Sequence, residues 1–200
     1  MNKGHIILSG SKKIIFSAPH AVEQTRDGKI KCAEAETALI VEKLNEMGYP
    51  CIIKTENVGD DANFDLECAY KDDLVKFIRE NGIVGVIDLH QLSPLREQDI
   101  CLGTGGEDCL NLLGHFDVEK ELQAHFAKYF TNVTVNNPFG AKGEGTISRY
   151  ISSRCDIPCV QVELNSKIFL ENQFTFDQLA NIFDEATDIW EMFDEKNLVD

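Results

Sequence analysis

Hydrophobic and polar positions along the chain follow two regular patterns. Short apolar runs are typical of strands buried on both faces, and apolar residues three or four positions apart are typical of amphipathic helices. The stretch VGVIDLHQL at residues 84–92 shows the first pattern, after the turn signal Asn81-Gly82. Residues 33–47 show the second, since their apolar side chains recur at helical spacing. These two segments predict a buried strand and an amphipathic helix.

The same patterns predict the remaining elements in alternation. We expect further strands at residues 13–17, 51–55, 99–103, 132–135 and 159–164, and further helices at 68–80, 117–130 and 175–196. Strands that alternate with helices indicate an α/β fold, here a three-layer sandwich with a mixed, largely parallel central sheet. No repeat, low-complexity tract or linker divides the sequence, so we expect residues 1–200 to form a single domain.

Charge and composition narrow the classes of function. The net charge of −15 argues against nucleic-acid binding, because phosphates would be repelled. No run approaches the roughly 18 apolar residues of a membrane span, and the N-terminus lacks the features of a signal peptide. We therefore expect a cytoplasmic protein that binds no membrane and no nucleic acid, and we make no prediction of its oligomeric state. The seven cysteines include no C-x-x-C pair, which predicts reduced thiols instead of disulfides or a cysteine zinc site.

Three predicted strands end in residues that bind metals or transfer protons. His20 follows the strand KIIFS, His90 ends the run VIDLH, and Glu163 lies near the end of CVQVELN. The carboxyl ends of parallel strands share one edge of a sheet, where α/β proteins bind their ligands. Asp88 and His90 are two residues apart, so their side chains point to the same face. A catalytic zinc site needs three protein ligands and one open position, and the two histidines would supply two ligands.

A carboxylate near His20 is needed as the third ligand, and the sequence offers two. Glu23 forms the short motif His-x-x-Glu with His20, a spacing that lets both side chains reach one metal ion. Glu34 lies in the first turn of the helix at 33–47, where the helix dipole favours a carboxylate. Without a metal ion, Glu23 would be a surface acid and Glu34 would only stabilise the start of the helix.

Glu163 has the surroundings of a catalytic base. Valines flank it at 160 and 162, and desolvation raises the pKa of a carboxyl group among apolar neighbours. A raised pKa suits a general base that takes a proton from zinc-bound water and passes it to a leaving amine. Asn165 could orient Glu163 through a hydrogen bond. The alternative role for Glu163 is a structural ion pair with Arg149 or Arg154.

The segment NNPFGAKGEGTISRY, residues 136–150, predicts a loop that contacts substrate. It combines glycines with polar side chains that bind a carboxylate or a developing oxyanion. Those side chains are Asn136, Asn137, Lys142 and Arg149. The alternative is a long connection made of ordinary turn residues.

Four motifs, SAPH, VIDLHQ, NNPFGAKGEGTI and VQVELN, occur in order within residues 13–169. Together they resemble the N-formylglutamate amidohydrolase family, whose fold is similar to that of zinc carboxypeptidases and aspartoacylases. The resemblance implies a mononuclear zinc hydrolase that cleaves a formyl or acyl amide from an acidic amino acid. It also implies that His20 and His90 are zinc ligands and that Glu163 is the base. The family's carboxylate ligand at the start of the next helix matches Glu34, whereas the spacing in carboxypeptidases matches Glu23.

One motif of that family is incomplete in this sequence. Relatives carry Asp-x-Asn-Arg after the second strand, and its Arg grips the substrate carboxylate. The corresponding GDDANFD offers Asp61 and Asn63, followed by Phe64 in place of the Arg. We expect Asn63 to contact substrate, and another cation would have to replace the missing Arg. The candidates are Arg26, Arg96, Arg149 and Arg154.

We accordingly expect a zinc-dependent amidohydrolase that cleaves the amide C–N bond of an N-formyl or N-acyl amino acid or a similar small substrate. One rival is a metal-binding or ligand-binding protein without catalysis. Another is a peptidase or cell-wall amidase that uses the same site. The second rival predicts an open groove, whereas a small-molecule enzyme predicts a closed pocket.

Overall fold

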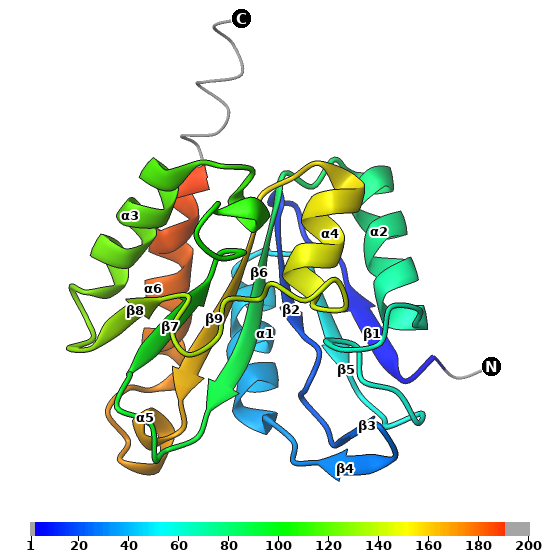
Figure 1. Cartoon of the computed structure of the whole chain (residues 1–200), viewed down its shortest axis with the longest axis horizontal. Coiled ribbons are helices and arrows are strands. Elements are labelled where there is room, and N and C mark those ends of the chain that lie inside the picture. The colour runs from blue at the N-terminus through cyan, green and yellow to red at the C-terminus, as the bar shows by residue number, and fades with distance from the viewer. Residues whose placement is uncertain (1–2, 191–200) are drawn as a thin grey trace, which may run out of the picture.

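The structure is a computed structural model that describes residues 3–190. Its centre is a seven-stranded sheet in the order β1-β5-β2-β6-β9-β7-β8 (Figure 1). Neighbouring strands are parallel, except where β1 pairs with β5 and β7 pairs with β9. The strands are β1 His5–Leu8, β2 Ile14–Ala18, β5 Cys51–Lys54, β6 Gly85–Leu92, β7 Ile100–Gly103, β8 Val133–Val135 and β9 Cys159–Asn165. The predicted mixed, largely parallel sheet is confirmed.

Helices cover both faces of this sheet (Figure 1). On one face lie α1 Ala35–Glu46, α3 Phe116–Phe126 and α6 Phe176–Thr187, and on the other lie α2 Ala69–Asn81 and α4 Ile147–Cys155. Successive strand residues point to opposite faces, so the sheet feeds two apolar cores. In β2, Phe16 packs into the core under α1 and α6, whereas Ile15 packs into the core under α2 and α4. The predicted three-layer sandwich is therefore confirmed.

A hairpin occupies the segment after β2 that the sequence suggested was a loop. Its strands are β3 Gln24–Arg26 and β4 Lys29–Lys31. The turn residues Asp27 and Gly28 have φ values of 51° and 71°. Positive φ at both central residues is the geometry of a type I′ turn, for which Asp-Gly is a preferred pair. The hairpin carries Arg26 toward the carboxyl ends of β2 and β6.

Two other segments differ from the expected loops and coils. The edge strand β1 was not predicted, and it pairs antiparallel with β5. Helix α4 begins at Ile147, inside the segment expected to be loop, after the extended residue Thr146. Short connecting helices also occur at α5 Lys167–Leu170, η1 Leu110–Leu112 and η2 Asp188–Trp190.

Two predicted helices end earlier than their patterns suggested. The helix expected at 117–130 is α3, which ends at Phe126 because the next amides, of Lys128 and Tyr129, bond to carbonyls only three residues back. The helix expected at 175–196 is α6, which ends at Thr187, and residues 191–196 of that prediction lie outside the described residues. Within residues 3–190, no helix has both the length and the apolar character needed to cross a membrane.

Candidate active site

The carboxyl ends of β2, β6 and β9 meet at one edge of the sheet. His20 lies two residues beyond the end of β2, and Glu163 pairs in register with His90 across β9 and β6. Glu34 is the N-cap residue of α1, and its backbone N–H donates a hydrogen bond to the carbonyl of His20 at 2.8 Å. Local backbone contacts therefore hold the two histidines and two glutamates in one small region.

His20, Glu34 and His90 form a group that could hold a metal ion. Each offers a ligand atom, and these atoms all lie within 4.8 Å of one another. The Nδ1 atoms of His20 and His90 are 3.2 Å apart. Glu34 Oε1 is 3.1 Å from His20 Nδ1, and Glu34 Oε2 is 3.2 Å from His90 Nδ1. Three donor atoms from three separate segments thus face one point.

The spacing and chemistry of these donors fit zinc. Ligands placed tetrahedrally at about 2.0–2.1 Å from a zinc ion are themselves about 3.3 Å apart. The two Nδ1 atoms are 3.2 Å apart, close to that value, and each lies 3.1 to 3.2 Å from a different oxygen of Glu34. Two imidazoles and one carboxylate also match the ligand set of catalytic zinc sites, which leave the fourth position open.

The outer nitrogen of each imidazole binds a buried carboxylate. His20 Nε2 donates to Asp61 Oδ1 at 2.8 Å, and His90 Nε2 donates to Asp88 Oδ2 at 3.0 Å. These bonds fix the tautomer in which Nε2 carries the proton and the Nδ1 lone pair faces the group. Carboxylates that orient metal-binding histidines in this way also raise their basicity. Among the described residues, Asp88 Oδ1 is buried without a hydrogen-bond partner. An unpaired buried acceptor lowers the free energy of unfolding, so the bond to His90 is made at a cost in stability.

The titration of the group reflects its charges. Burial opposes the charge of His90, but the carboxylates of Asp88 and Glu34 outweigh it and raise its pKa well above the ordinary value. Burial likewise opposes the charge of His20, but hydrogen bonds to Asp61 and Glu34 raise its pKa. Burial disfavours ionised Glu34, yet His90 and His20 lower its pKa to about 2. Without a metal ion, His20 and His90 therefore bind protons at the position where a metal cation would bind.

Glu163 lies beside this group and is 7% exposed. Burial raises its pKa to about 7, and the nearby carboxylates add to the effect while the imidazoles oppose it. Its Oε1 accepts a hydrogen bond of 2.8 Å from Gln161 Nε2. No arginine of the described residues pairs with it, and the Asn165 side chain donates instead to the carbonyls of Arg96 and Gln98. Gln161, two residues before Glu163, therefore orients it in place of Asn165.

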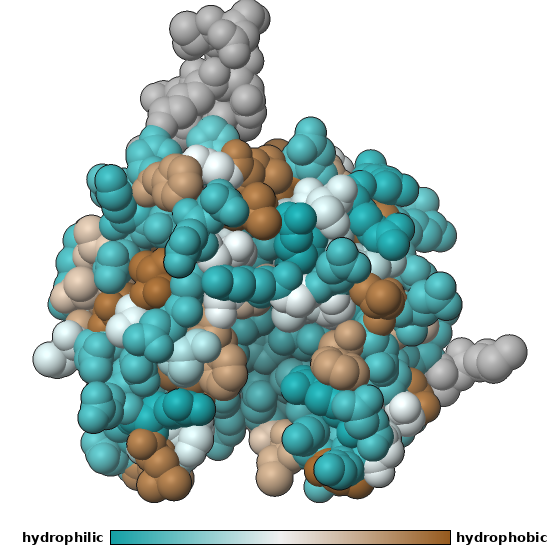
Figure 2. Space-filling view, viewed as in Figure 1, coloured by the Kyte–Doolittle hydropathy of each residue, from teal (hydrophilic) through white to brown (hydrophobic). Residues whose placement is uncertain are grey.

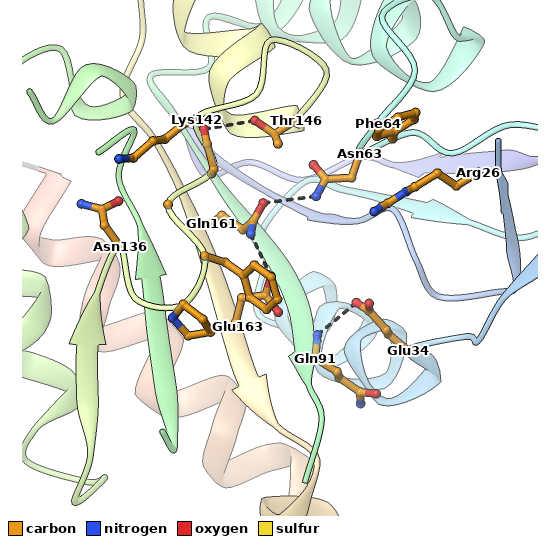
Figure 3. Close-up of a pocket in the computed structure, with 14 residues that line it drawn as sticks. Arg26, Glu34, Asn63, Phe64, Gln91, Asn136, Lys142, Thr146, Gln161 and Glu163 are labelled. Carbon is orange, nitrogen blue, oxygen red and sulfur yellow. Dashed lines mark hydrogen bonds between the residues drawn. The ribbon is translucent and has the colours of Figure 1, made fainter. Parts of the chain in front are cut away.

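A cavity of about 610 Å³ lies over the site. Figure 2 shows it as a hollow with a largely hydrophilic floor in the lower centre of this face. The lining side chains come from both halves of the sheet and from the loop between β8 and α4 (Figure 3). They are Arg26, Glu34, Asn63, Phe64, Gln91, Asn136, Pro138, Phe139, Gly140, Ala141, Lys142, Thr146, Gln161 and Glu163.

The residues expected from the sequence fall into two sets. The structure brings Asn63 and Lys142 to the cavity, together with the metal-binding group and Glu163. Glu23 is exposed and does not belong to that group, so Glu34 is the carboxylate placed to bind a metal. Asn137 is exposed before the cis bond to Pro138 and does not line the cavity. Arg149 lies on α4 and faces a separate cavity of about 160 Å³.

The sequence alone did not single out three residues of the site. Arg26 was only one of several candidate cations, Asp61 was quoted only as part of an incomplete motif, and Gln161 was not singled out. The signals were nevertheless present. An Asp-Gly turn places Arg26 on a hairpin, and Gln161 shares the strand face of Glu163 because the two are two residues apart.

Comparisons with known proteins show similarity at the level of the fold. No family model matches this sequence, and no curated protein matches it. The gene product Atu2144 from Agrobacterium tumefaciens superposes with a TM-score of 0.62 at 11% identity, over 97% of each chain. The zinc-free form of YNDL gives 0.54 at 12% identity, over 92% of this chain and 89% of that one. A bacteriophage poly-gamma-glutamate hydrolase gives 0.53 at 12% identity, over 98% of this chain and 90% of that one.

These similarities show a shared fold, and they extend over nearly the whole chain. None of the three is named as an N-formylglutamate amidohydrolase, so that family assignment stays a prediction from the motifs. The chain is an α/β protein with the fold of a known hydrolase, and it carries a His, Glu, His group suited to a metal ion.

Proposed function

We propose that this protein is a zinc-dependent amidohydrolase that cleaves an amide C–N bond. The observation that carries the proposal is the meeting of ligand atoms from His20, Glu34 and His90, all within 4.8 Å of one another, beside a buried Glu163 whose pKa is raised to about 7. The cavity over these residues gives a substrate access to them. The shared fold with a poly-gamma-glutamate hydrolase and with a protein solved in a zinc-free form supports the same class of chemistry.

The residues of the chain divide the work of hydrolysis. His20, Glu34 and His90 would hold the zinc ion, which supplies a Lewis acid that polarises a carbonyl and lowers the pKa of water. Glu163 takes a proton from the attacking water, whose oxygen forms a bond to the carbonyl carbon. Glu163 then returns the proton to the nitrogen as the C–N bond breaks. A pKa of about 7 suits both steps, because the carboxyl group then takes up and releases a proton near neutral pH.

The cations of the cavity favour a substrate with a carboxylate. Arg26 Nε donates to Asp61 Oδ2 at 2.7 Å, and its guanidinium lies 4.9 Å from the centre of the Phe64 ring. No hydrogen bond from its terminal nitrogens occurs among the described residues, and Figure 3 shows them directed into the cavity. Lys142 has no ion pair within residues 3–190. In a chain with a net charge of −15, the remaining N–H donors of Arg26, which is paired with Asp61 through Nε, and the ammonium of Lys142 together favour an anionic ligand in this cavity.

The substrate proposed on this basis is an N-formyl or N-acyl amino acid, or a similar small amide. Arg26 would bind its carboxylate in place of the Arg that Phe64 replaces. The proposal agrees with the motif resemblance, in which an arginine binds the substrate carboxylate. A guanidinium suits that role because it forms paired hydrogen bonds to a carboxylate.

A longer, peptide-like amide is the second candidate substrate. The cavity is open in Figure 2, and the rings of Phe64 and Phe139 at its rim are each 43% exposed. Exposed aromatic rings beside a polar cleft are typical of surfaces that bind an extended ligand. A peptidase or cell-wall amidase would use both rings to hold an extended chain across the cavity.

The test is an assay of the zinc-loaded protein against a panel of N-formyl and N-acyl amino acids and short glutamyl and muramyl peptides. Hydrolysis of the first group alone supports the small substrate, and hydrolysis of the second supports the longer one. Zinc binding without hydrolysis of any member would instead indicate a binding protein. Glu163→Gln should lower kcat by about 10²- to 10⁴-fold with zinc retained. The exposed Glu107→Gln is the matched control and should keep full activity.

A further inference from the structure

A chain of hydrogen bonds joins the start of α4 to Glu163. The backbone N–H of Ile147 donates to Asn63 Oδ1 at 2.7 Å. Asn63 Nδ2 donates to Gln161 Oε1 at 3.2 Å, and Gln161 Nε2 donates to Glu163 Oε1 at 2.8 Å. Figure 3 shows the last two bonds, which cross the floor of the cavity. We name this chain of Ile147 N–H, Asn63, Gln161 and Glu163 the amide relay.

We propose that the amide relay sets the orientation of the Glu163 carboxylate, so that Asn63 and Gln161 are positioning residues for the general base. The inference rests on the proposed hydrolase function and adds a role for two residues that the metal-binding group does not involve. It also changes the expected role of Asn63 from a contact with substrate to a support for Gln161.

The direction of the amide relay is fixed by its first donor. A backbone N–H can only donate, so the side chain of Asn63 must turn its oxygen toward Ile147 and its amino group toward Gln161. Gln161 must then turn its oxygen toward Asn63 and its amino group toward Glu163. Flipping either amide would place two donors or two acceptors against each other. The relay therefore has one arrangement that satisfies all of its bonds, and that arrangement ends on Glu163.

The first donor of the amide relay would otherwise lack a partner. Ile147 is the first residue of α4, and the N–H groups of a helix's first turn have no acceptor within the helix. The N-cap residue Thr146 makes no capping bond with its side chain, so Asn63 provides the acceptor from another segment. The partial positive charge of the helix N-terminus favours this polarity.

Burial and packing keep the amide relay rigid. Gln161 is 3% exposed and shares the face of β9 with Glu163. The turn that carries Asn63 lies so close to the loop before α4 that a Cβ on Gly145 would be 1.9 Å from the carbonyl oxygen of Phe64. Lys71, buried under the same turn, donates to the carbonyls of both Asp65 and Gly145. The two segments that the relay connects are thus tied together independently of it.

The test uses a double-mutant cycle on the zinc-loaded, full-length protein. Gln161→Met keeps the length of the side chain but removes the donor to Glu163. Asn63→Asp keeps the acceptor for Ile147 but removes the donor to Gln161. Gln123→Met is the matched control, because Gln123 on α3 also makes one amide hydrogen bond, to the carbonyl of Val133, away from the cavity.

Gln161→Met should lower kcat by about 10- to 100-fold with little change in KM, because a misplaced catalytic group slows the chemical step and not binding. Asn63→Asp should act in the same direction, and the double variant should lose no more than the larger single loss, since both act through one network. Zinc content should stay at one ion per chain. Crystal structures should show the Glu163 carboxylate displaced in Gln161→Met and unmoved in Gln123→Met.

An unchanged kcat in Gln161→Met, or a rise in KM alone in either variant, would overturn the amide relay, since the latter result indicates direct contact with substrate. Independent, additive losses would overturn it as well. Failure of the hydrolase proposal looks different, because the wild-type protein would then bind zinc and hydrolyse nothing. In that case an unmoved Glu163 carboxylate in the Gln161→Met crystal structure would still refute the relay.

Discussion

At the scale of single residues, two neighbouring strands use the same device. On β6, Asp88 lies two residues before His90, and on β9, Gln161 lies two residues before Glu163. The strands are parallel and in register, so Asp88 pairs with Gln161 and His90 pairs with Glu163. Each reactive side chain at the edge of the sheet therefore has a supporting side chain one step deeper on the same face.

The support of His90 by Asp88 can be tested through metal affinity. Asp88→Asn keeps the size of the side chain but removes the buried carboxylate that accepts from His90 Nε2. Loss of such an outer partner costs about 10- to 100-fold in metal affinity. We expect that increase in the zinc Kd, measured by competition with a chromophoric chelator. Asp108→Asn, at an exposed position, should leave the Kd unchanged, and an equal Kd in Asp88→Asn would refute the support.

Arg26 provides a second test at this scale. Arg26→Gln removes the positive charge that the structure directs into the cavity. For a substrate with a free carboxylate, we expect KM to rise by at least about 10-fold, as for the loss of a charge-assisted hydrogen bond. The same substrate with its carboxylate amidated should bind the two proteins alike. Equal KM values for the free acid would show that Arg26 does not bind it.

The sequence indicated the reactive residues better than their supports. His20, His90 and Glu163 were identifiable because each lies at the end of an apolar run, and Glu34 because it begins a helix. Asp61 reaches His20 from 41 residues further along the chain, and nothing local predicts that contact. Glu23 has the more familiar spacing from His20, yet the turn into β3 leaves it exposed. Spacing along the sequence predicts proximity in space only within one element. Here the chain turns into the hairpin after His20, so Glu23 does not lie near the metal-binding group.

At the scale of elements, long periodic segments were predictable and short or irregular ones were not. The helices α1 and α2 and the buried strands β2, β5, β6 and β9 lie within a few residues of their predicted positions. The hairpin of β3 and β4 was missed, because strands of three residues carry too few side chains for a pattern. Helix α4 was missed because glycines before it gave the appearance of one long loop. The missed hairpin carries Arg26, and the missed helix α4 begins with Ile147, whose N–H starts the amide relay. The elements that the sequence pattern failed to predict are therefore the ones that carry residues of the site.

The close approach of two loops beside the cavity leads to a prediction at this scale. A Cβ on Gly145 would lie 1.9 Å from the Phe64 carbonyl oxygen, whereas one on Gly143 would lie 3.7 Å from its nearest neighbour. Gly145→Ala must push the turn carrying Asn63 away from α4. We expect about 1–3 kcal/mol of lost stability, as for other overpacked sites, and a lower kcat. Gly143→Ala in the same loop should change neither, as chemical denaturation and the hydrolysis assay will show.

At the scale of the whole molecule, negative charge surrounds a site that would bind a cation. The chain carries 34 acidic against 19 basic residues. A field of this sign attracts a divalent metal ion and repels an anionic substrate, so the bound ion and the cavity's own cations must offset it locally. Metal loading and substrate binding are therefore expected to respond to pH and salt in opposite ways.

The pH dependence of folding stability follows from the same charges. In the metal-free protein, His20 and His90 have pKa values raised above the usual 6.5. The stability that they contribute is fully present below pH 6.5 and is lost as the pH rises through their folded pKa values. Glu163, raised from 4.5 to about 7, acts in the same direction over a lower range. The carboxyl groups of Glu34 and Asp61 have lowered pKa values, so their contribution is lost only in acid.

Zinc reverses this trend, because it takes the place of the Nδ1 protons of His20 and His90, whereas Nε2 of each ring keeps the proton that it donates to Asp61 or Asp88. Its stabilisation of the folded state should be small at about pH 5.5, where protons compete, and large at about pH 8. Thermal unfolding with and without zinc across that range measures the difference in Tm. The variant His90→Ala should lose the zinc-dependent shift at every pH. A shift of equal size at both ends of the range would mean that zinc binds elsewhere, since only ligands that release protons on binding couple metal affinity to pH in this window.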